Sequence, residues 1–517
     1  MKKYILYSIK TCALLIFLSS LFVSCEDFLE KPVGGDITID TIFTSSSNAQ
    51  QLIFSLYHDD YFNPNNIAIN WWDQPQWYAS WSEIGENIYY DDFSWMWNIV
   101  YVNGTMSPTS DQIYPLNYLY RAVRIANTFI EMASSIDAVS QSDQEYIKKM
   151  KGEAHAHLAY QYYRGMRLWG SLPWIGEKLN GGEEPVERIP YCDFVDSIVY
   201  HLDIAASLLP DYWEDRFTGR FTSVAAKTLK ARVLVYAASP LYNGPVPDYA
   251  SGYEHPEVLG YGSYDPNRWK IAADACLDAI NAAGAAGHAL YNESGERKNI
   301  YHLSINLTDE HILYQRYKTT NLEGGWFYVH NMMNWPHGIG WYKKPEITYQ
   351  PTLRHVDRYQ MINGKFPIEG YVDNDPTQPV ISSAGIAAGY DDQEYWKDRD
   401  NRFEQNIVRH GKLFGENYNS LPVNFDPATS NPNLSGWAGF KTNFIVRKFV
   451  NEALGESPSI VYTPVNPIIR LADLYLLYAE ALSEYNDGPT GEGLYYFNQV
   501  RARSGMPDYN SENYPGG

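Results

Sequence analysis

Three segments of the chain share one pattern of small and large residues. Gly152–Met166 (GEAHAHLAYQYYRGM), Ala225–Ser239 (AAKTLKARVLVYAAS) and Arg470–Glu484 (RLADLYLLYAEALSE) carry small residues early and tyrosine or leucine later. Small residues let two helices approach closely, and large residues fill the space beside the contact. The pattern therefore favours an all-α scaffold built from helices that pack in pairs.

Further amphipathic stretches extend the helical pattern. Residues 117–133 place apolar side chains at i, i+3, i+4 and i+7, which is typical of a helix with one buried face. The irregular spacing between copies predicts degenerate tetratricopeptide-like helix pairs with long insertions. Other helices are expected over 140–170, 222–239, 265–284, 466–488 and 491–505.

Local signals predict where some of these helices begin and end. Ser142 or Asp143 is a suitable N-cap for the second helix, because a short polar side chain can accept a hydrogen bond from the first turn. Gly170 is expected to end that helix, and Gly284 is expected to end the helix that begins near residue 265.

The region 295–465 has a different composition, rich in Gly, Pro, Asn and Tyr. Only short strands are expected there, at Glu310–Tyr317 and Asn443–Val450. Because a long irregular region between helical parts is usually functional, this region is expected to carry part of a ligand face.

The N-terminus has the features of a bacterial export signal. Lys2, Lys3 and Lys10 flank the apolar stretch Thr11–Val23, which is too short to span a bilayer comfortably. A small residue then precedes Cys25, as in lipoprotein signals. Residues 1–24 are therefore expected to be a signal peptide and Cys25 to be lipidated. An ordinary secretory signal stays open as the alternative.

The charge of the chain limits the class of ligand. There are 61 acidic and 40 basic residues, which gives a formal net charge of −21. Nucleic acid is excluded as the expected partner, because phosphate binding needs clustered Lys and Arg. A neutral or cationic ligand fits this surface better.

Tryptophan gathers in two clusters, and aromatic rings with a polar edge suit the apolar faces of sugar rings. Some rings in each cluster are expected to bind ligand and the others to pack in the protein. The candidate ligand residues of the first cluster, in residues 69–101, are Trp71, Trp72, Trp95, Trp97 and Asn98. Those of the second cluster are Trp326, Trp335 and Trp341.

The sequence offers few candidates for catalysis or metal binding. Glu153 and His157 share a helix face, but two ligands fall short of a zinc site, so core packing is the preferred interpretation. No catalytic residue, metal site or cofactor is expected, although a calcium ion at the surface stays open. Cys192 and Cys276 are expected to be buried thiols.

Several segments together resemble one known family, the SusD/RagB outer-membrane nutrient-binding lipoproteins of Bacteroidetes. They follow the family's order along nearly the whole chain. They are CEDFLEKPVGG, RAVRIANTFIE, KGEAHAHLAYQYYRGMRLWGSLPWI, GRFTSVAAKTLKARVLVYAASPLYN, PTLRHVDRYQMINGKFP, DRDNRFEQNIVRHG, IIRLADLYLLYAEAL and FNQVRARSGMP.

The resemblance implies a single body over residues 25–517, with an N-terminal part near 26–245 and a C-terminal part near 295–517. It implies four tetratricopeptide-like units that support a loop-rich ligand face, and no catalysis. Family members usually continue past RARSGMP, so the chain is expected to be truncated at its C-terminus.

The resemblance also implies a function and partners. An oligosaccharide is the expected ligand, a SusC-like TonB-dependent transporter the expected partner, and the exterior of the outer membrane, through the lipid anchor, the expected location. Two alternatives stay open: a peptide-binding member of the same family, and a secreted glycoside hydrolase on a helical scaffold.

Overall fold

A computed structural model gives the structure of the chain. It describes residues 42–58, 62, 86–87, 116–176, 186–316, 334–335, 346–347, 349–391, 394–414, 421–422, 444–448, 450–455, 463, 465–489 and 491–510.

Helices dominate these residues, which confirms the all-α prediction. The long helices are α3 (Ser46–Ser55), α7 (Leu116–Met132), α8 (Gln141–Trp169), α9 (Tyr191–Leu208), α10 (Ser223–Ala238), α11 (Asn267–Ala285), α17 (Leu471–Asn486) and α18 (Gly491–Ala502). The short helices are α12 (Asn299–Ile305), α14 (Leu353–Asp357), α15 (Ser383–Ala387) and α16 (Asn401–Asn406).

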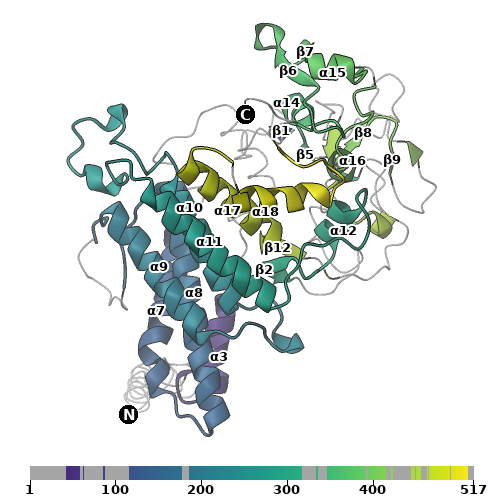
Figure 1. Ribbon diagram of the computed structural model, residues 1–517. Coiled ribbons are helices and arrows are strands. Elements are labelled where there is room, and N and C mark those ends of the chain that lie inside the picture. Colours follow the sequence, from purple (N-terminus) through teal and green to yellow (C-terminus); the bar gives the residue numbers. More distant parts are fainter. Residues whose placement is uncertain are drawn as a thin grey trace, which may run out of the picture.

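The long helices form a layered scaffold. From α7 to α11, each helix packs against the next one along the chain, as expected for tetratricopeptide-like pairs (Figure 1). α3 packs against α7 and α8, and α17 packs against α11 and α18. The C-terminal helices therefore extend a scaffold that the N-terminal half begins.

The strands are short, and each sheet within the described residues consists of two antiparallel strands. The pairs are β1 (Glu86–Asn87) with β5 (Tyr349–Gln350), β2 (His311–Arg316) with β12 (Val465–Arg470), β3 (Asn334–Trp335) with β4 (Glu346–Ile347), β6 (Ile368–Tyr371) with β7 (Pro379–Ile381), β8 (Ile407–Arg409) with β11 (Phe444–Val446), and β9 (Leu413–Phe414) with β10 (Leu421–Pro422).

The core of the scaffold contains an ion pair as well as apolar side chains. Glu153 on α8 is fully buried and pairs with Arg220, whose Nε donates to the carboxylate at 2.7 Å. The hydroxyl of Tyr57 donates to the same carboxylate at 2.6 Å. His157 is buried beside the rings of Tyr57 and Phe221, with centroids 4.3 and 4.9 Å away. The expectation that Glu153 and His157 pack in the core is confirmed.

Two predicted helix boundaries are wrong. The N-cap of α8 is Ser140, whose Oγ accepts from the amide of Asp143 at 3.1 Å, while Asp143 accepts from the amide of Val139. This reciprocal pair satisfies two free amides at once, which neither Ser142 nor Asp143 could do as the cap. Likewise α11 continues past Gly284, and the glycine with positive φ that follows the helix is Gly287. Gly170 does end α8, as expected.

The helix expected over residues 466–488 is a strand followed by a helix. Val465–Arg470 form β12, and α17 begins only at Leu471. Pro467 disfavours helical geometry at the residue before it, and the β-branched pair Ile468 and Ile469 suits a strand. Pairing with β2 then outweighs the helical pattern.

The tight contact between α8 and α9 yields a first prediction. A Cβ at Gly152 would lie 3.0 Å from Leu208 Cβ and 3.0 Å from Leu209 Cγ. Gly152→Ala should lower the free energy of unfolding by about 1–3 kcal/mol, because overpacking outweighs the gain in helix propensity. Denaturant unfolding measures the change.

Gly284→Ala is the matched control, since a Cβ there meets nothing within 4 Å. It should raise the unfolding free energy by up to about 1 kcal/mol. Equal effects of the two substitutions would contradict the close approach of α8 and α9.

A histidine pair lies at the same helix interface. Nδ1 of His155 on α8 and Nδ1 of His201 on α9 are 2.7 Å apart, so at least one of the two rings must be neutral to accept the hydrogen bond. Burial, His201 and the charge of Lys151 lower the pKa of His155 to about 3, and burial lowers the pKa of His201 to about 4. The folded state therefore resists protonation of this pair.

Stability should accordingly depend on pH in a defined direction. An unfolded histidine binds a proton near pH 6.5, whereas the folded pair stays neutral to a much lower pH. The unfolding free energy should therefore fall as the pH drops below about 6.5, by up to about 1.4 kcal/mol per pH unit for each histidine. His201→Gln should make this dependence shallower, as measured by denaturant unfolding at several pH values.

Candidate ligand-binding face

Most of the predicted ligand residues lie outside the described residues. Only the backbone of Trp335 is described, as the second residue of β3. Cys25 also lies outside the described residues. The other candidates there are Trp71, Trp72, Trp95, Trp97, Asn98, Trp326 and Trp341.

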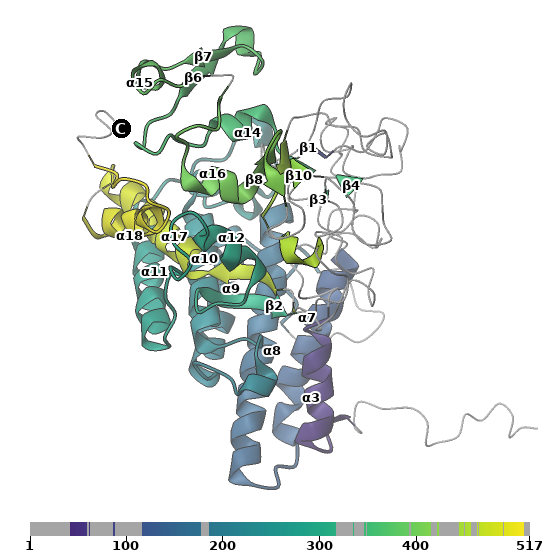
Figure 2. The same cartoon turned by 90° about the vertical axis from the view of Figure 1, so that its right-hand side faces the viewer.

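The backbone nevertheless brings the two tryptophan-rich segments to one place. β1, from the first segment, pairs with β5, with Glu86 opposite Gln350. β3, from the second segment, pairs with β4, with Trp335 opposite Glu346. β4 and β5 belong to one stretch, residues 346–350, here called the anchor segment. Figure 2 shows β1, β3 and β4 together on the side of the molecule away from α17 and α18.

The anchor segment leads directly into α14. Thr352 caps this helix, with its Oγ1 accepting from the amide of His355 at 3.2 Å. β5 also contacts β11, so the anchor segment is held by two neighbouring elements. The place where the tryptophan segments meet is therefore fixed to folded structure on its C-terminal side.

Arg399 holds the far end of α14. Its Nη2 donates to the carbonyls of Val356 and Tyr359, each at 2.7 Å, and its Nη1 donates to the carbonyl of Tyr395 at 3.0 Å. In α14 the amide of Tyr359 donates to the Val356 carbonyl at 3.2 Å, and the guanidinium adds a second donor to this end of the helix. Burial lowers the pKa of Arg399 from its ordinary value, although an arginine stays charged at neutral pH.

A small apolar core lies beneath α14, separate from that of the helical scaffold. It consists of Val356, Phe403, Ile407 and Phe444, all buried. Ile407 and Phe444 belong to the sheet formed by β8 and β11. The anchor segment is thus attached to a compact unit built from α14, α16 and this sheet.

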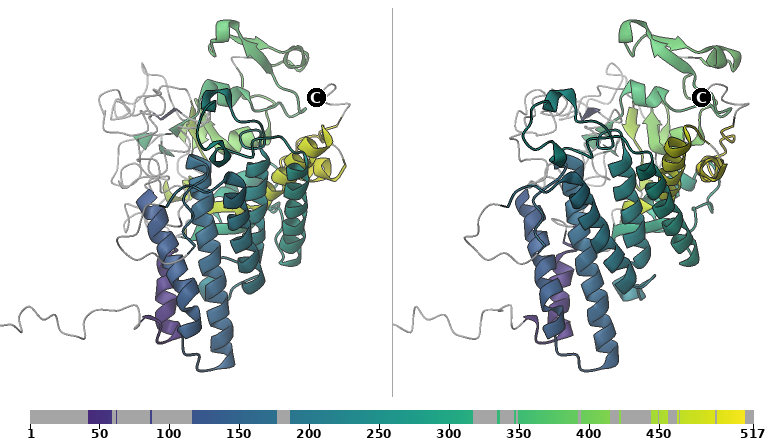
Figure 3. Two further views of the ribbon diagram at one scale, coloured as in Figure 1. Left: turned by 90° about the vertical axis from the view of Figure 1, so that its left-hand side faces the viewer. Right: turned by 60° about the vertical axis from the view of Figure 1, so that its left-hand side comes forward.

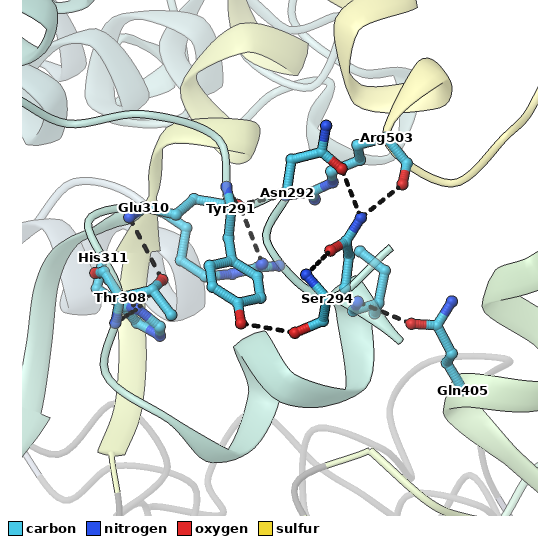
Figure 4. A network of polar contacts seen from close by, with 11 residues as sticks. Tyr291, Asn292, Ser294, Thr308, Glu310, His311, Gln405 and Arg503 are labelled. Atoms are coloured by element: carbon cyan, nitrogen blue, oxygen red, sulfur yellow. Dashed lines mark hydrogen bonds and ion pairs between the residues drawn. The ribbon is translucent and has the colours of Figure 1, made fainter. Parts of the chain in front are cut away.

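A buried polar network connects the compact unit to the scaffold (Figure 4). Gln405 on α16 accepts from the amides of Ile300 and Tyr301 on α12, at 2.8 and 3.2 Å. Asn299, the first residue of α12, donates to the carbonyl of Arg503 at 3.0 Å. Arg503 pairs in turn with the fully buried carboxylate of Glu310. Hydrogen bonds therefore connect α16 of the compact unit to α12, and α12 to Arg503, the residue that follows α18.

The same carboxylate gathers several donors. Arg470 lies 3.1 Å from Glu310, and the amide of Tyr291 donates to Glu310 at 2.9 Å. Lys448 lies in the same charged surroundings, and burial, Arg470 and Arg503 lower its pKa to about 8. Three basic side chains, those of Arg470, Arg503 and Lys448, therefore lie around the buried Glu310 carboxylate.

Two further expectations concern cysteine and metal. Cys276 is buried as expected, but Cys192 is exposed on α9, and both are free thiols. Cys192 differs because it occupies the outer face of α9, next to Asp193. Among the described residues, no group of three or more His, Cys, Asp or Glu side chains is arranged to hold a metal ion.

Among the helices that the structure describes, none combines the length and the apolar character that a bilayer crossing requires.

The sequence did not identify the residues that position the face. Arg399, Gln405 and Arg503 lie in segments that carried the family resemblance, DRDNRFEQNIVRHG and FNQVRARSGMP. Their partners are main-chain groups and a carboxylate far away in sequence. The sequence signal that could have identified these residues is the high density of Arg, Asn and Gln in the two segments.

Comparisons with known proteins point to one family. The SusD family model matches residues 309–517, and a second model, described as starch-binding and associating with the outer membrane, matches residues 44–235. The SusD-like protein P25 of Formosa agariphila is 21% identical over 515 residues, which cover 95% of this chain and 80% of that protein.

Solved structures have the same fold. The structure of BT4246 matches with a TM-score of 0.72 at 21% identity and covers 91% of this chain and 84% of that one. A laminarin-binding SusD-like protein matches with a TM-score of 0.57 at 18% identity and covers 90% of this chain and 86% of that one. At these identities the structures establish the fold.

The contacts of Arg399 yield the third prediction. Arg399→Met keeps the apolar stem but removes the donors to the carbonyls of Tyr359 and Tyr395, while the Val356 carbonyl keeps the amide of Tyr359. The compact unit should lose about 2–4 kcal/mol, since each of these two carbonyls left unpaired costs about 1–3 kcal/mol. Denaturant unfolding measures the loss, and hydrogen exchange should locate it in α14.

Arg216→Met is the control, because the Arg216 side chain is 71% exposed, forms an ion pair with the exposed Glu214 and lies over the ring of Phe217. This exposed pair should contribute less than about 1 kcal/mol. Equal stability of the two variants would show that Arg399 does not hold α14.

Proposed function

Since the chain belongs to the SusD family, we propose that it binds oligosaccharides at the face formed by its two tryptophan segments and that it catalyses no reaction. The observation that carries this proposal is the pairing of β1 and β3 with one anchor segment. Two segments far apart in sequence, each rich in the residue type best suited to sugar rings, are joined to the same short stretch of backbone.

Tryptophan suits this ligand for a physical reason. A pyranose ring has an apolar CH face surrounded by hydroxyl groups, and an indole ring offers a flat apolar surface with one donor at its edge. Stacking one sugar on one ring removes on the order of 100 Å² of apolar surface from water, which stabilises the complex by roughly 2.5 kcal/mol. The summed stacking free energy of several rings then exceeds, by a small margin, the free-energy cost of association, which is at least about 4 kcal/mol.

A modest affinity is consistent with a protein that captures a nutrient and releases it. The family description places its members at the outer membrane. We propose that lipidated Cys25 anchors the protein to the exterior of that membrane, and that a SusC-like TonB-dependent transporter receives the ligand. Purification of the full-length protein from its native membranes, with identification of co-purifying proteins, tests this part. Absence of any such transporter would contradict it.

The fourth prediction tests the ligand face. Trp335→Ala should weaken glycan binding by about 10- to 70-fold, the equivalent of losing one stacked ring. Isothermal titration calorimetry against neutral glycans, beginning with laminarin because a structural relative binds it, measures the affinity. Unfolding midpoints of both proteins show whether the variant is folded.

Tyr212→Ala is the control. Tyr212 is 80% exposed but follows α9 and lies outside the segments that pair with the anchor segment. It should leave the affinity unchanged. Release of reducing ends by the purified protein would favour a glycoside hydrolase instead. Binding of peptides without binding of any glycan would favour a peptide-binding member of the family.

A further inference from the structure

One connection between scaffold helices is far longer than the fold requires. α10 and α11 are packed neighbours, and such helices are usually joined by about 2–8 residues. Here residues 239–266 join them, with no α-helix or strand inside. This stretch, here called the tyrosine loop, contains the 3-10 turns η4 (Asp248–Ala250) and η5 (Pro256–Val258). Ordered loops of this length usually have a function.

The base of the tyrosine loop is rigid. The ring of Tyr242 stacks on Tyr191 of α9, with centroids 4.3 Å apart and planes at 10°. The amide of Tyr261 donates to the carbonyl of Tyr242 at 2.9 Å, which closes the loop on itself. A Cβ at Gly260 would lie 2.8 Å from that same carbonyl, so the closure requires glycine.

Polar contacts fix the second end of the loop. Asn243 accepts from the amide of Asp265 at 2.9 Å and donates to the carbonyl of Asp265 at 3.0 Å. Arg268, at the start of α11, donates to Asn243 at 2.7 Å and lies over the ring of Tyr261 at 3.8 Å. The loop is therefore held in a defined position on the scaffold before any ligand binds.

This rigid base displays aromatic rings to solvent. Tyr249 on η4 is 86% exposed, Tyr264 is 58% exposed and Tyr253 is 51% exposed. Ala250 and Val258, by contrast, point inward and are buried. Fully burying a large apolar side chain stabilises a fold by about 1.5–3 kcal/mol. Because the three tyrosines are largely exposed, each contributes only part of this stabilisation. The fold therefore does not account for their presence on the loop.

The charge of the loop selects the class of ligand. Residues 239–266 contain Asp248, Glu254, Glu257 and Asp265 but no Lys or Arg. An anionic ligand is disfavoured next to these carboxylates. A neutral sugar is favoured, because its CH faces can stack on tyrosine rings while carboxylates and phenol groups bind its hydroxyls.

The loop lies apart from the paired strands β1 and β5. In Figure 1 the loop (teal) is beyond the ends of α9 and α10 at the upper left, whereas β1 and β5 are at the upper right. Figure 3, which views the molecule from the side of the loop, shows it at the end of the scaffold helices. A short oligosaccharide at β1 and β3 would leave the loop free, whereas a long chain could reach both.

We propose that the tyrosine loop is a second carbohydrate-binding surface, which contacts a neutral polysaccharide whose other part is held at the tryptophan segments. The inference rests on the proposed function, because it takes the same ligand class. Two linked weak contacts increase retention of a polymer without raising the affinity for a short fragment.

The fifth prediction separates the two surfaces. The full-length protein, purified in detergent, is compared with Tyr249→Ala/Tyr253→Ala by affinity electrophoresis in laminarin, xyloglucan, starch and galactomannan. The double variant should bind the retarding polysaccharide about tenfold more weakly. Its affinity for the matching hexasaccharide, measured by calorimetry, should be unchanged. Because both side chains are exposed, its unfolding midpoint should equal that of the unsubstituted protein.

Tyr200→Ala/Tyr212→Ala is the matched control, since these tyrosines are 62% and 80% exposed on other parts of the scaffold. It should retain full binding to the polysaccharide. If the loop variant also retains full binding, the second surface is excluded while the proposed function stands. If no glycan binds the unsubstituted protein, both fail. If the loop variant loses only its association with another protein, the loop is a protein contact and the carbohydrate proposal is wrong.

Discussion

A single buried carboxylate connects parts of this protein that lie far apart in the sequence. Glu310 precedes β2 and is fully buried, where an isolated charge would be very unfavourable. Arg470 at the end of β12 and Arg503 after α18 both pair with it, and the amide of Leu471 donates to its carbonyl at 2.9 Å. Because the charge is tolerated only with these partners in place, the first strand of the irregular region and the last two helices must fold together.

Ion pairs between an arginine and a carboxylate connect distant segments elsewhere in the molecule as well. Arg220 pairs with Glu153 beneath α3 and α8, and Arg232 on α10 pairs with Asp473 on α17. Arg399 donates to carbonyls instead of a carboxylate, but it too joins separate segments, those around Val356 and Tyr395. Apolar packing is non-directional, whereas a guanidinium with several partners specifies one arrangement. These contacts therefore fix the positions of segments that lie far apart in the sequence.

The sequence predicted the helices better than the contacts between them. The helical patterns of α7, α8, α10 and α18 are local, so a window of 15 to 20 residues is enough to find them. The pairing of Glu310 with Arg503 joins residues 193 positions apart, and no local pattern reveals it. β12 was predicted as helix because its partner β2 also lies far away in the sequence, with Val465 opposite Arg316 and Arg470 opposite His311. For the candidate face, composition identified the two tryptophan segments, but only the backbone pairs with residues 346–350 show that they meet.

A rigid frame and weak individual contacts together suit transient capture. A stacked sugar that contributes roughly 2.5 kcal/mol dissociates readily on its own. Two surfaces on one rigid scaffold, the tryptophan segments and the tyrosine loop, would hold a long chain more firmly than a short one, because the second contact forms at a lower association cost than the first. Shortening the chain then removes the second contact and with it most of the retention. In this arrangement ligand length, and not a conformational change of the protein, would decide when the sugar is released.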